Sequence, residues 1–134
     1  MQCYCATARR VARRLNRMYE AELRGAGMNP AQFELLNYLR EMPGVNQAAL
    51  AEAMDLDQTT LSRNVRVLVE QGWIVASPGL KDRRVSTYGL SDAGVVALQV
   101  AMPLWERVKA RVEGSLGSTE AVWGVLRELG VAAR

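Results

Sequence analysis

The stretch that decides the fold runs from Asn46 to Leu90 and reads NQAALAEAMDLDQTTLSRNVRVLVEQGWIVASPGLKDRRVSTYGL. It has the pattern of two short helices at a tight turn, followed by a β-hairpin whose tip carries the charged run Lys81–Arg84. Such a pair of helices can hold its second helix in a DNA groove while the hairpin grips the backbone. The stretch therefore predicts a helix-turn-helix with a basic wing.

Local signals mark the ends of these elements. Asn46 is a suitable N-cap for the first helix, and Asp57 for a second that runs to about Gln71, with Gly72 just past its end. The runs 73–76 and 85–90 are rich in β-branched and aromatic residues and predict two strands. Between them, Ser77-Pro78-Gly79 has the composition of a turn.

The flanking segments predict helices on both sides of this stretch. Residues 3–24 alternate apolar and arginine-rich faces at the helical period, and Asn29-Pro30 begins a helix that ends at Pro43-Gly44. Ser91 caps a long helix from Asp92 to about Glu113, which Pro103 should kink, and a last helix spans roughly 119–129. The prediction is a mainly α protein with a small β-hairpin wing. A single domain covers residues 1–134, with the winged helix-turn-helix at 30–90.

Composition excludes several classes of protein. The 134 residues include no histidine, so neither a Ser-His-Asp nor a Cys-His catalytic arrangement is available. Cys3 and Cys5 alone supply too few ligands for a structural zinc site. We therefore expect no enzyme, no metal and no cofactor. No apolar run approaches the roughly 20 residues that span a bilayer, and the first eight residues lack a signal peptide. These features predict a cytoplasmic protein without a membrane partner.

The net charge of +3 does not by itself locate a DNA-binding segment. Residues 1–24 hold six arginines and two glutamates, whereas residues 46–90 hold five basic and five acidic residues, a balance of zero. An electrostatic argument must therefore rest on the face that each charge occupies.

The helix after Asp57 has one apolar and one polar face. Leu61, Val65 and Leu68 lie within about 60° of one another and should face the core. The opposite arc holds Thr59, Thr60, Arg63, Arg66 and Val67, mostly in the first half of the helix, the part that enters a major groove in helix-turn-helix proteins. An arginine there can bond guanine bidentately, and a threonine can bond base edges. The alternative is an ordinary solvated face.

At the wing, Asp82 has no evident partner except Arg83 or Arg84. A carboxylate two residues from an arginine can brace its guanidinium so that it points into a minor groove. The alternative is an ordinary polar hairpin tip. The predicted DNA-contacting set is Gln47, Gln58, Thr59, Thr60, Arg63, Arg66, Lys81, Asp82, Arg83 and Arg84.

Over nearly its whole length the chain resembles the MarR family of winged helix-turn-helix regulators. The segments that carry the resemblance are Asn29–Phe33, Leu50–Met54, Asp57–Arg63, Leu68–Gly72, Asp82–Arg84 and Leu90–Gly94. The Asp-x-Arg wing followed by Leu-Ser-x-x-Gly is fairly specific to this family. The resemblance implies a homodimer that joins through residues 1–24 and 91–134 and binds a pseudo-palindromic operator in double-stranded DNA. It also implies that Asp82 is the bracing acid and Arg84 the minor-groove arginine.

The flanking helices also favour a dimer on their own composition. The first helix has a broad apolar face, and residues 95–126 add many apolar side chains to one small domain. The alternative is that these helices pack only against each other within a monomer.

Two kinds of signal are open to such a regulator. Cys5 lies near a helix N-terminus with Arg9 one turn on, an environment that favours the thiolate. Its 14-residue spacing to Tyr19 resembles the organic-hydroperoxide-sensing branch of the family, although Pro30 stands where that branch carries a second tyrosine. A buried structural thiol is the alternative. The other family habit is a small aromatic ligand, in a cleft that could be lined by Tyr38, Trp73, Trp105 and the first-helix arginines.

The sequence thus predicts a DNA-binding transcriptional regulator, most simply a repressor that a ligand or thiol oxidation relieves. A winged-helix module for protein–protein docking is the alternative, because the fold does not dictate the function. The outward surface of the helix after Asp57 separates the two, since an apolar surface there would favour a protein partner.

Overall fold

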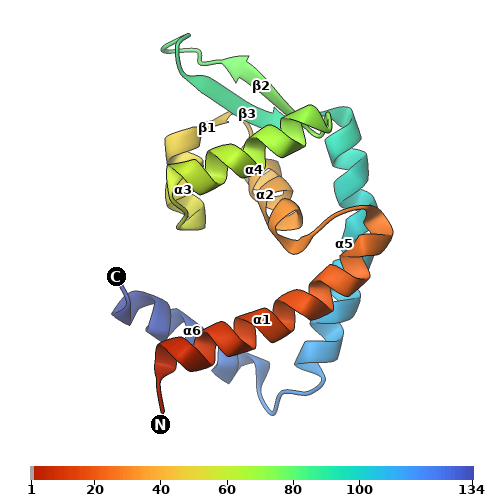
Figure 1. Ribbon diagram of the computed structural model, residues 1–134, viewed down its shortest axis with the longest axis vertical. Helices are drawn as coiled ribbons and strands as arrows, with labels where there is room; N and C mark the ends of the chain where they lie inside the picture. The colour runs from red at the N-terminus through yellow and green to blue at the C-terminus, as the bar shows by residue number, and fades with distance from the viewer. Residues whose placement is uncertain (1) are drawn as a thin grey trace.

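The computed structural model describes residues 2–134 as a helical protein with one small sheet (Figure 1). The helices are α1 (Tyr4–Leu23), the 3-10 turn η1 (Arg24–Ala26), α2 (Pro30–Glu41), α3 (Gln47–Met54), α4 (Gln58–Glu70), α5 (Asp92–Glu113) and α6 (Thr119–Ala132). The strands are β1 (Val45–Asn46), β2 (Ile74–Pro78) and β3 (Ser86–Leu90). The predicted order of four helices, a hairpin and two more helices is confirmed.

The N-caps are those that the sequence predicts. The Asn46 side chain accepts a hydrogen bond from the Ala49 amide at 2.9 Å, and Asp57 accepts one from the Thr60 amide at 2.8 Å. Ser91 accepts from the Gly94 amide at 3.0 Å. Each cap satisfies one of the amides that a helix start leaves without an intrahelical partner. The sixth helix runs three residues past its expected end, and α5 continues across Pro103 without interruption.

The sheet has three strands in the order β1-β3-β2, all antiparallel, rather than the two strands expected. Val45 pairs with Tyr88, a contact that the hairpin pattern did not predict. The predicted turn at Ser77-Pro78-Gly79 is wrong in part, because Ser77 and Pro78 belong to β2 and pair with Thr87 and Ser86. Pro78 is tolerated there because β2 is an edge strand, where a missing amide donor costs little. The loop of the wing is 79–85.

A leucine-rich core joins α2, α3 and α4 to the sheet and to α5. Leu61, Val65 and Leu68 of α4 are buried, as their spacing predicts. The largest fully buried side chains are Leu23, Leu35, Leu36, Leu39, Leu50, Leu61, Leu68 and Val108. This core fixes the orientation of α4, so the face opposite Leu61, Val65 and Leu68 points to solvent.

A close contact joins the start of α5 to the start of the hairpin. Gly94 is buried, and a Cβ added to it would overlap the Trp73 carbonyl oxygen. The Ser91 amide donates to that same oxygen at 3.1 Å, and the Ser91 hydroxyl donates to the Gly72 carbonyl. The Leu-Ser-x-x-Gly sequence therefore ties the wing to α5 through a site where only glycine fits.

The ends of the chain are packed very differently. The C-terminal end of α1 is tied to α5, where Glu22 pairs with Arg107 at 3.1 Å and with Arg111 at 3.4 Å. Toward its N-terminus Tyr4 is 84% exposed, and α6 buries no residue at all. Within one chain α1 therefore buries only Leu23 and α6 buries no residue, whereas α5 buries Leu98, Ala101 and Val108. The homodimer stays a prediction.

An apolar groove of about 770 Å³ lies between the N-terminal half of α1 and α6. In the view of Figure 1, α6 crosses behind α1. Its lining residues are Gln2, Cys3, Tyr4, Thr7, Ala8, Val11, Ala12, Leu15, Leu126 and Leu129. No helix in residues 2–134 combines the length and apolarity that a membrane crossing requires.

Candidate nucleic-acid interface

The exposed face of α4 presents the polar arc that the sequence predicts. Thr59, Arg63 and Arg66 are exposed on the side opposite the buried leucines. Within residues 2–134, none of the ion pairs within 4.0 Å involves Arg63 or Arg66. Both guanidinium groups therefore keep their donors available for a ligand outside the chain.

Thr60 differs from its expected role. Its hydroxyl donates to the Asp57 carboxylate at 2.7 Å, while its amide donates to the same carboxylate at 2.8 Å. These two hydrogen bonds, the hydroxyl contact first, hold the pKa of Asp57 below its usual value. The Thr60 hydroxyl proton is thus used inside the cap, and only its lone pairs and methyl group are left for an outside partner.

A polar hollow of about 380 Å³ lies where α3 meets α4. It is lined by Gln47, Gln58, Thr59, Ser62, Arg63 and Arg66. The Gln47 side-chain amide donates to the Gln58 carbonyl oxygen at 3.4 Å, which links the starts of the two helices. The structure therefore gathers the predicted α3 and α4 residues at one site.

Ser62 is a member of this site that the sequence reasoning missed. It sits one turn after Gln58 and one turn before Arg66, on the edge between the buried and outward faces of α4. Helical spacing alone contains the signal, because residues four apart lie on one face. An outward arc on α4 that extended to the edge of the buried face would have included Ser62.

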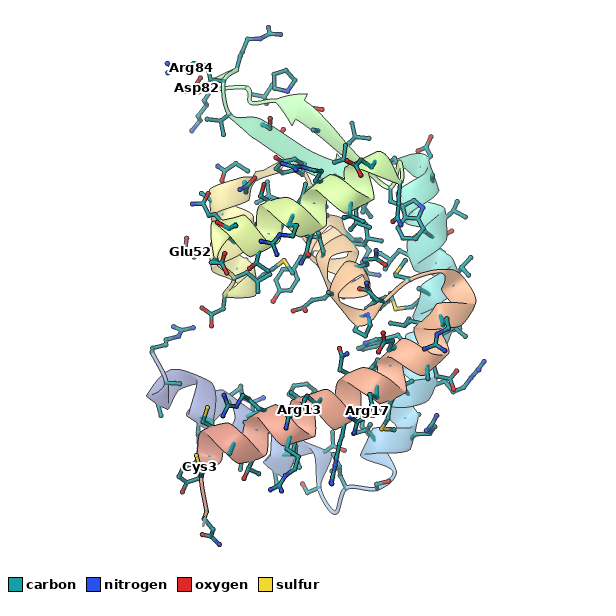
Figure 2. The ribbon with its side chains drawn as sticks, in the orientation of Figure 1. Cys3, Arg13, Arg17, Glu52, Asp82 and Arg84 are labelled. Atoms are coloured by element: carbon teal, nitrogen blue, oxygen red, sulfur yellow. The ribbon has the colours of Figure 1, made fainter. Side chains whose placement is uncertain are left out.

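The wing tip contains the predicted brace. The Arg84 guanidinium donates to both oxygens of Asp82, from Nε at 3.1 Å and from the second terminal nitrogen at 3.2 Å. The Arg84 amide also donates to Asp82, at 3.0 Å. These contacts, the side-chain one first, lower the pKa of Asp82, so the carboxylate is charged at neutral pH. The Arg84 side chain is 91% exposed and stands beside Asp82 at the end of the hairpin (Figure 2).

Lys81 and Arg83 lie on the same loop and are exposed. The wing loop and the α4 arc form the two parts of the candidate interface. The arginines of α1 are not part of it: Arg13 and Arg17 lie on α1, at the opposite side of the molecule from the wing (Figure 2). The most basic segment of the sequence is thus separate from the candidate interface.

The two residues of the proposed thiol sensor are not brought together within one chain. Cys5 is exposed, so the chain does not itself bury this thiol, and Cys3 is partly exposed as the N-cap residue of α1. Tyr19 lies on the same helix, about 21 Å along it at the usual rise per residue. Burial, and next to it the nearby Glu113 carboxylate, raises the pKa of Tyr19.

The aromatic residues expected to line a ligand cleft, Tyr38, Trp73 and Trp105, are partly buried and packed against the core. Trp105 stacks on Phe33 with ring centroids 5.5 Å apart and lies 6.4 Å from Tyr19. In the part of the chain that the structure describes, no cluster of three or more Cys, Asp or Glu side chains could hold a metal ion.

Comparison with known proteins matches this architecture. Residues 26–85 match the family model described as the MarR family. The crystal structure of the M. tuberculosis transcriptional regulator MosR in complex with DNA superposes with a TM-score of 0.91 at 35% identity, over 98% of this chain and 96% of that one. The chain belongs to the MarR family. The members of this family are transcriptional regulators.

Two further relatives extend the comparison. The transcriptional repressor CouR, bound to a 23-mer DNA duplex, superposes with a TM-score of 0.86 at 25% identity, over 98% of this chain and 93% of that one. A putative transcriptional regulatory protein for the hcr operon of Thauera aromatica is 36% identical over 72 residues, which are 54% of this chain. The matched region covers 43% of that relative and 58% of a Bacillus cereus HTH-type regulator, so the chain spans about half the length of these curated relatives.

Proposed function

We propose that this MarR-family protein is a sequence-specific regulator of transcription that binds double-stranded DNA. The observation that carries the proposal is the pairing of two free arginines on α4 with a braced arginine on the wing. Arg63 and Arg66 face solvent without an ion pair among the described residues, while Asp82 holds Arg84 in a fork of two hydrogen bonds. Arginine forks suit guanine edges in the major groove and the negative potential of a narrow minor groove.

The distribution of charge explains how a segment with no net charge can bind a polyanion. Asp82 is paired with Arg84, so its charge is balanced at the wing tip, while Asp57 is held at the N-cap of α4 by hydrogen bonds from Thr60. The arginines remain directed outward. Affinity for DNA then depends on their placement rather than on bulk charge.

The proposal includes a homodimer that reads a pseudo-palindromic operator. Support comes from α6, which buries no residue in the chain, and from the apolar groove beside α1, which a second copy would fill. Two-fold symmetry would place the two α4 helices about 34–36 Å apart, one turn of DNA. The structures of MosR in complex with DNA and of CouR bound to a DNA duplex support the DNA-binding part of the proposal.

The alternative of a protein-docking module is less well supported. The hollow between α3 and α4 is lined by Gln47 of α3 and by one glutamine, two hydroxyl residues and two arginines of α4. A docking surface for a protein would present a more apolar centre there.

The test is binding of the purified protein to a random pool of duplexes across a series of salt concentrations. We expect enrichment of a near-palindromic sequence. Arg84→Ala should weaken binding to all duplexes and flatten the salt slope by about one unit. Arg63→Ala should cost about 1–3 kcal/mol and relax the preference at one base pair. If wild-type protein enriches no sequence, or neither variant changes its binding, the proposal is wrong.

The proposal also covers the signal that releases the protein from DNA. Cys5 is exposed on α1, next to the helix face that would meet a second copy, so a change at this thiol can reach the dimer. We expect Cys5→Ser to bind DNA as wild type does and to resist release by an organic hydroperoxide. Release of the serine variant by peroxide would contradict a sensing role for this thiol and would leave a small aromatic ligand as the alternative signal.

A further inference from the structure

The wing carries an apolar side chain, Leu80, to which the proposed function assigns no role. Leu80 is fully exposed, more so than any other large apolar side chain in residues 2–134. It follows Gly79 at the start of the loop and precedes Lys81. Other exposed large apolar side chains lie on the terminal helices, such as Tyr4, on α5, such as Val96, and on the wing itself, such as Val85, but each is less exposed than Leu80. The wing lies at the opposite end of the molecule from the α1–α6 groove (Figure 1). A dimer formed through that groove would therefore not cover Leu80.

The loop that presents Leu80 is fixed by its own hydrogen bonds. The Gly79 amide donates to the Val85 carbonyl oxygen at 2.7 Å, and the Val85 amide donates to the Asp82 carbonyl oxygen at 3.1 Å. A Cβ at Gly79 would lie 2.6 Å from the Asp82 oxygen and 2.8 Å from the Val85 oxygen. The tip is thus a closed turn in which glycine is required, and Leu80 is held at its outer surface.

The same turn holds the braced arginine. Asp82 accepts two hydrogen bonds from the loop backbone and side chain of Arg84 at its Oδ1 atom, two residues beyond Leu80. When Arg84 enters a minor groove, the neighbouring residues of the loop come close to the same groove. The walls of that groove are the C–H surfaces of deoxyribose, which offer an apolar side chain contact without any hydrogen bond.

We propose that Leu80 is a DNA-contacting residue of the wing, which packs against the deoxyribose walls of the minor groove next to the position of Arg84. The inference rests on the proposed function and adds an apolar contact to its charged ones. Because leucine carries no charge, this contact strengthens binding without releasing counterions, so it leaves the salt dependence unchanged. A single exposed leucine is common on protein surfaces, and this ordinary explanation is one outcome of the test.

The experiment uses the duplex that wild-type protein enriches from a random pool, with Leu80→Ala and the matched control Val75→Ala. Val75 lies on β2 of the same hairpin, away from the tip, and is 48% exposed. Leu80→Ala should weaken binding about tenfold at every salt concentration, with the slope of the wild type. Val75→Ala should bind as wild type does. Equal thermal unfolding of the three proteins shows that the fold is unchanged.

A second arm tests the location of the contact. The duplex is shortened from both ends until Arg84→Ala no longer affects binding, and at that length wild type and Leu80→Ala should bind equally. Persistence of the Leu80→Ala defect on the short duplex, or a flattened salt slope, overturns the inference. So does equal binding of wild type and Leu80→Ala on the full duplex, while DNA binding itself stands. Absence of any duplex bound by wild type overturns the proposed function and the inference together.

Discussion

Two regions of the molecule differ in how much of their apolar surface they bury. The winged-helix lobe comprises residues 30–90 with the start of α5, and the helical base comprises α1 and α6. In the lobe, apolar residues of α2, α3, α4 and the sheet meet in one core, and Leu36, Leu50 and Leu61 are completely buried. In the base, α6 buries nothing, and Trp123 and Leu126 are about half exposed. The lobe buries its apolar residues within its own chain, whereas the base exposes an apolar surface of the kind that a partner covers. This difference indicates that recognition and assembly belong to separate parts of the molecule.

The largest expected effect separates the base from the lobe. Leu126→Asp should raise the dimer dissociation constant about a thousandfold, because two unpaired carboxylates per dimer would be buried at roughly 2 kcal/mol each. Sedimentation velocity over a range of concentrations measures the change. The lobe should keep its structure, since Leu126 does not belong to its core.

The matched control for this change is Val75→Asp, which adds the same charge at a half-exposed residue of the lobe. It should sediment as wild type does. A Leu126→Asp protein that remains a dimer would show that α6 is not part of the contact between copies.

The next effect tests how tightly the lobe is packed. Gly94→Ala should lower the free energy of unfolding by about 3 kcal/mol, because the new methyl group would displace α5 from the Trp73 carbonyl oxygen. Urea unfolding measures it. Gly89→Ala on β3 is the control: no atom lies within 4 Å of its added Cβ, and its change should stay below about 1 kcal/mol. Equal stabilities of the two variants would contradict the close contact between wing and α5.

The smallest effect concerns the brace at the wing. The hydrogen bonds from Arg84 lower the pKa of Asp82, so the brace persists at all pH values above the ordinary range of a carboxyl group and is lost as pH falls through the lowered value. An NMR titration of the Asp82 carboxyl carbon should show this low pKa, and Arg84→Ala should raise it toward the ordinary value. Lys81→Ala, at a neighbour with no hydrogen bond to this carboxylate, should leave the titration nearly unchanged. An Asp82 pKa that is the same with and without Arg84 would mean that the brace does not form in solution.

The sequence predicts best the features whose partners are close along the chain. The caps at Asn46, Asp57 and Ser91 join a side chain to an amide three residues away, so residue type and position suffice. The Asp82–Arg84 brace spans two residues and was predictable for the same reason. Helical spacing likewise assigned Leu61 and Val65 to the buried face of α4.

Features that depend on distant or competing partners were not predictable in this way. The β1 strand has only two residues and exists because Val45 meets Tyr88 across the fold. Thr60 lies on the outward arc, but spacing does not reveal that its hydroxyl is bonded to Asp57. Among the aromatic residues suggested for a ligand cleft, Trp105 stacks on Phe33 of another helix, a contact that helical spacing does not reveal.

The measurement that tests the central proposal most directly is a hydroxyl-radical footprint of wild-type protein and Arg84→Ala on the duplex that wild type enriches. Two symmetric α4 contacts predict two protected regions about 10–10.5 base pairs apart, flanked by minor-groove protections at the wings. The flanking protections should disappear in Arg84→Ala while the central pair remains. A single protected region, or flanking protection that persists without Arg84, would contradict a dimer that reads DNA with α4 and the braced wing.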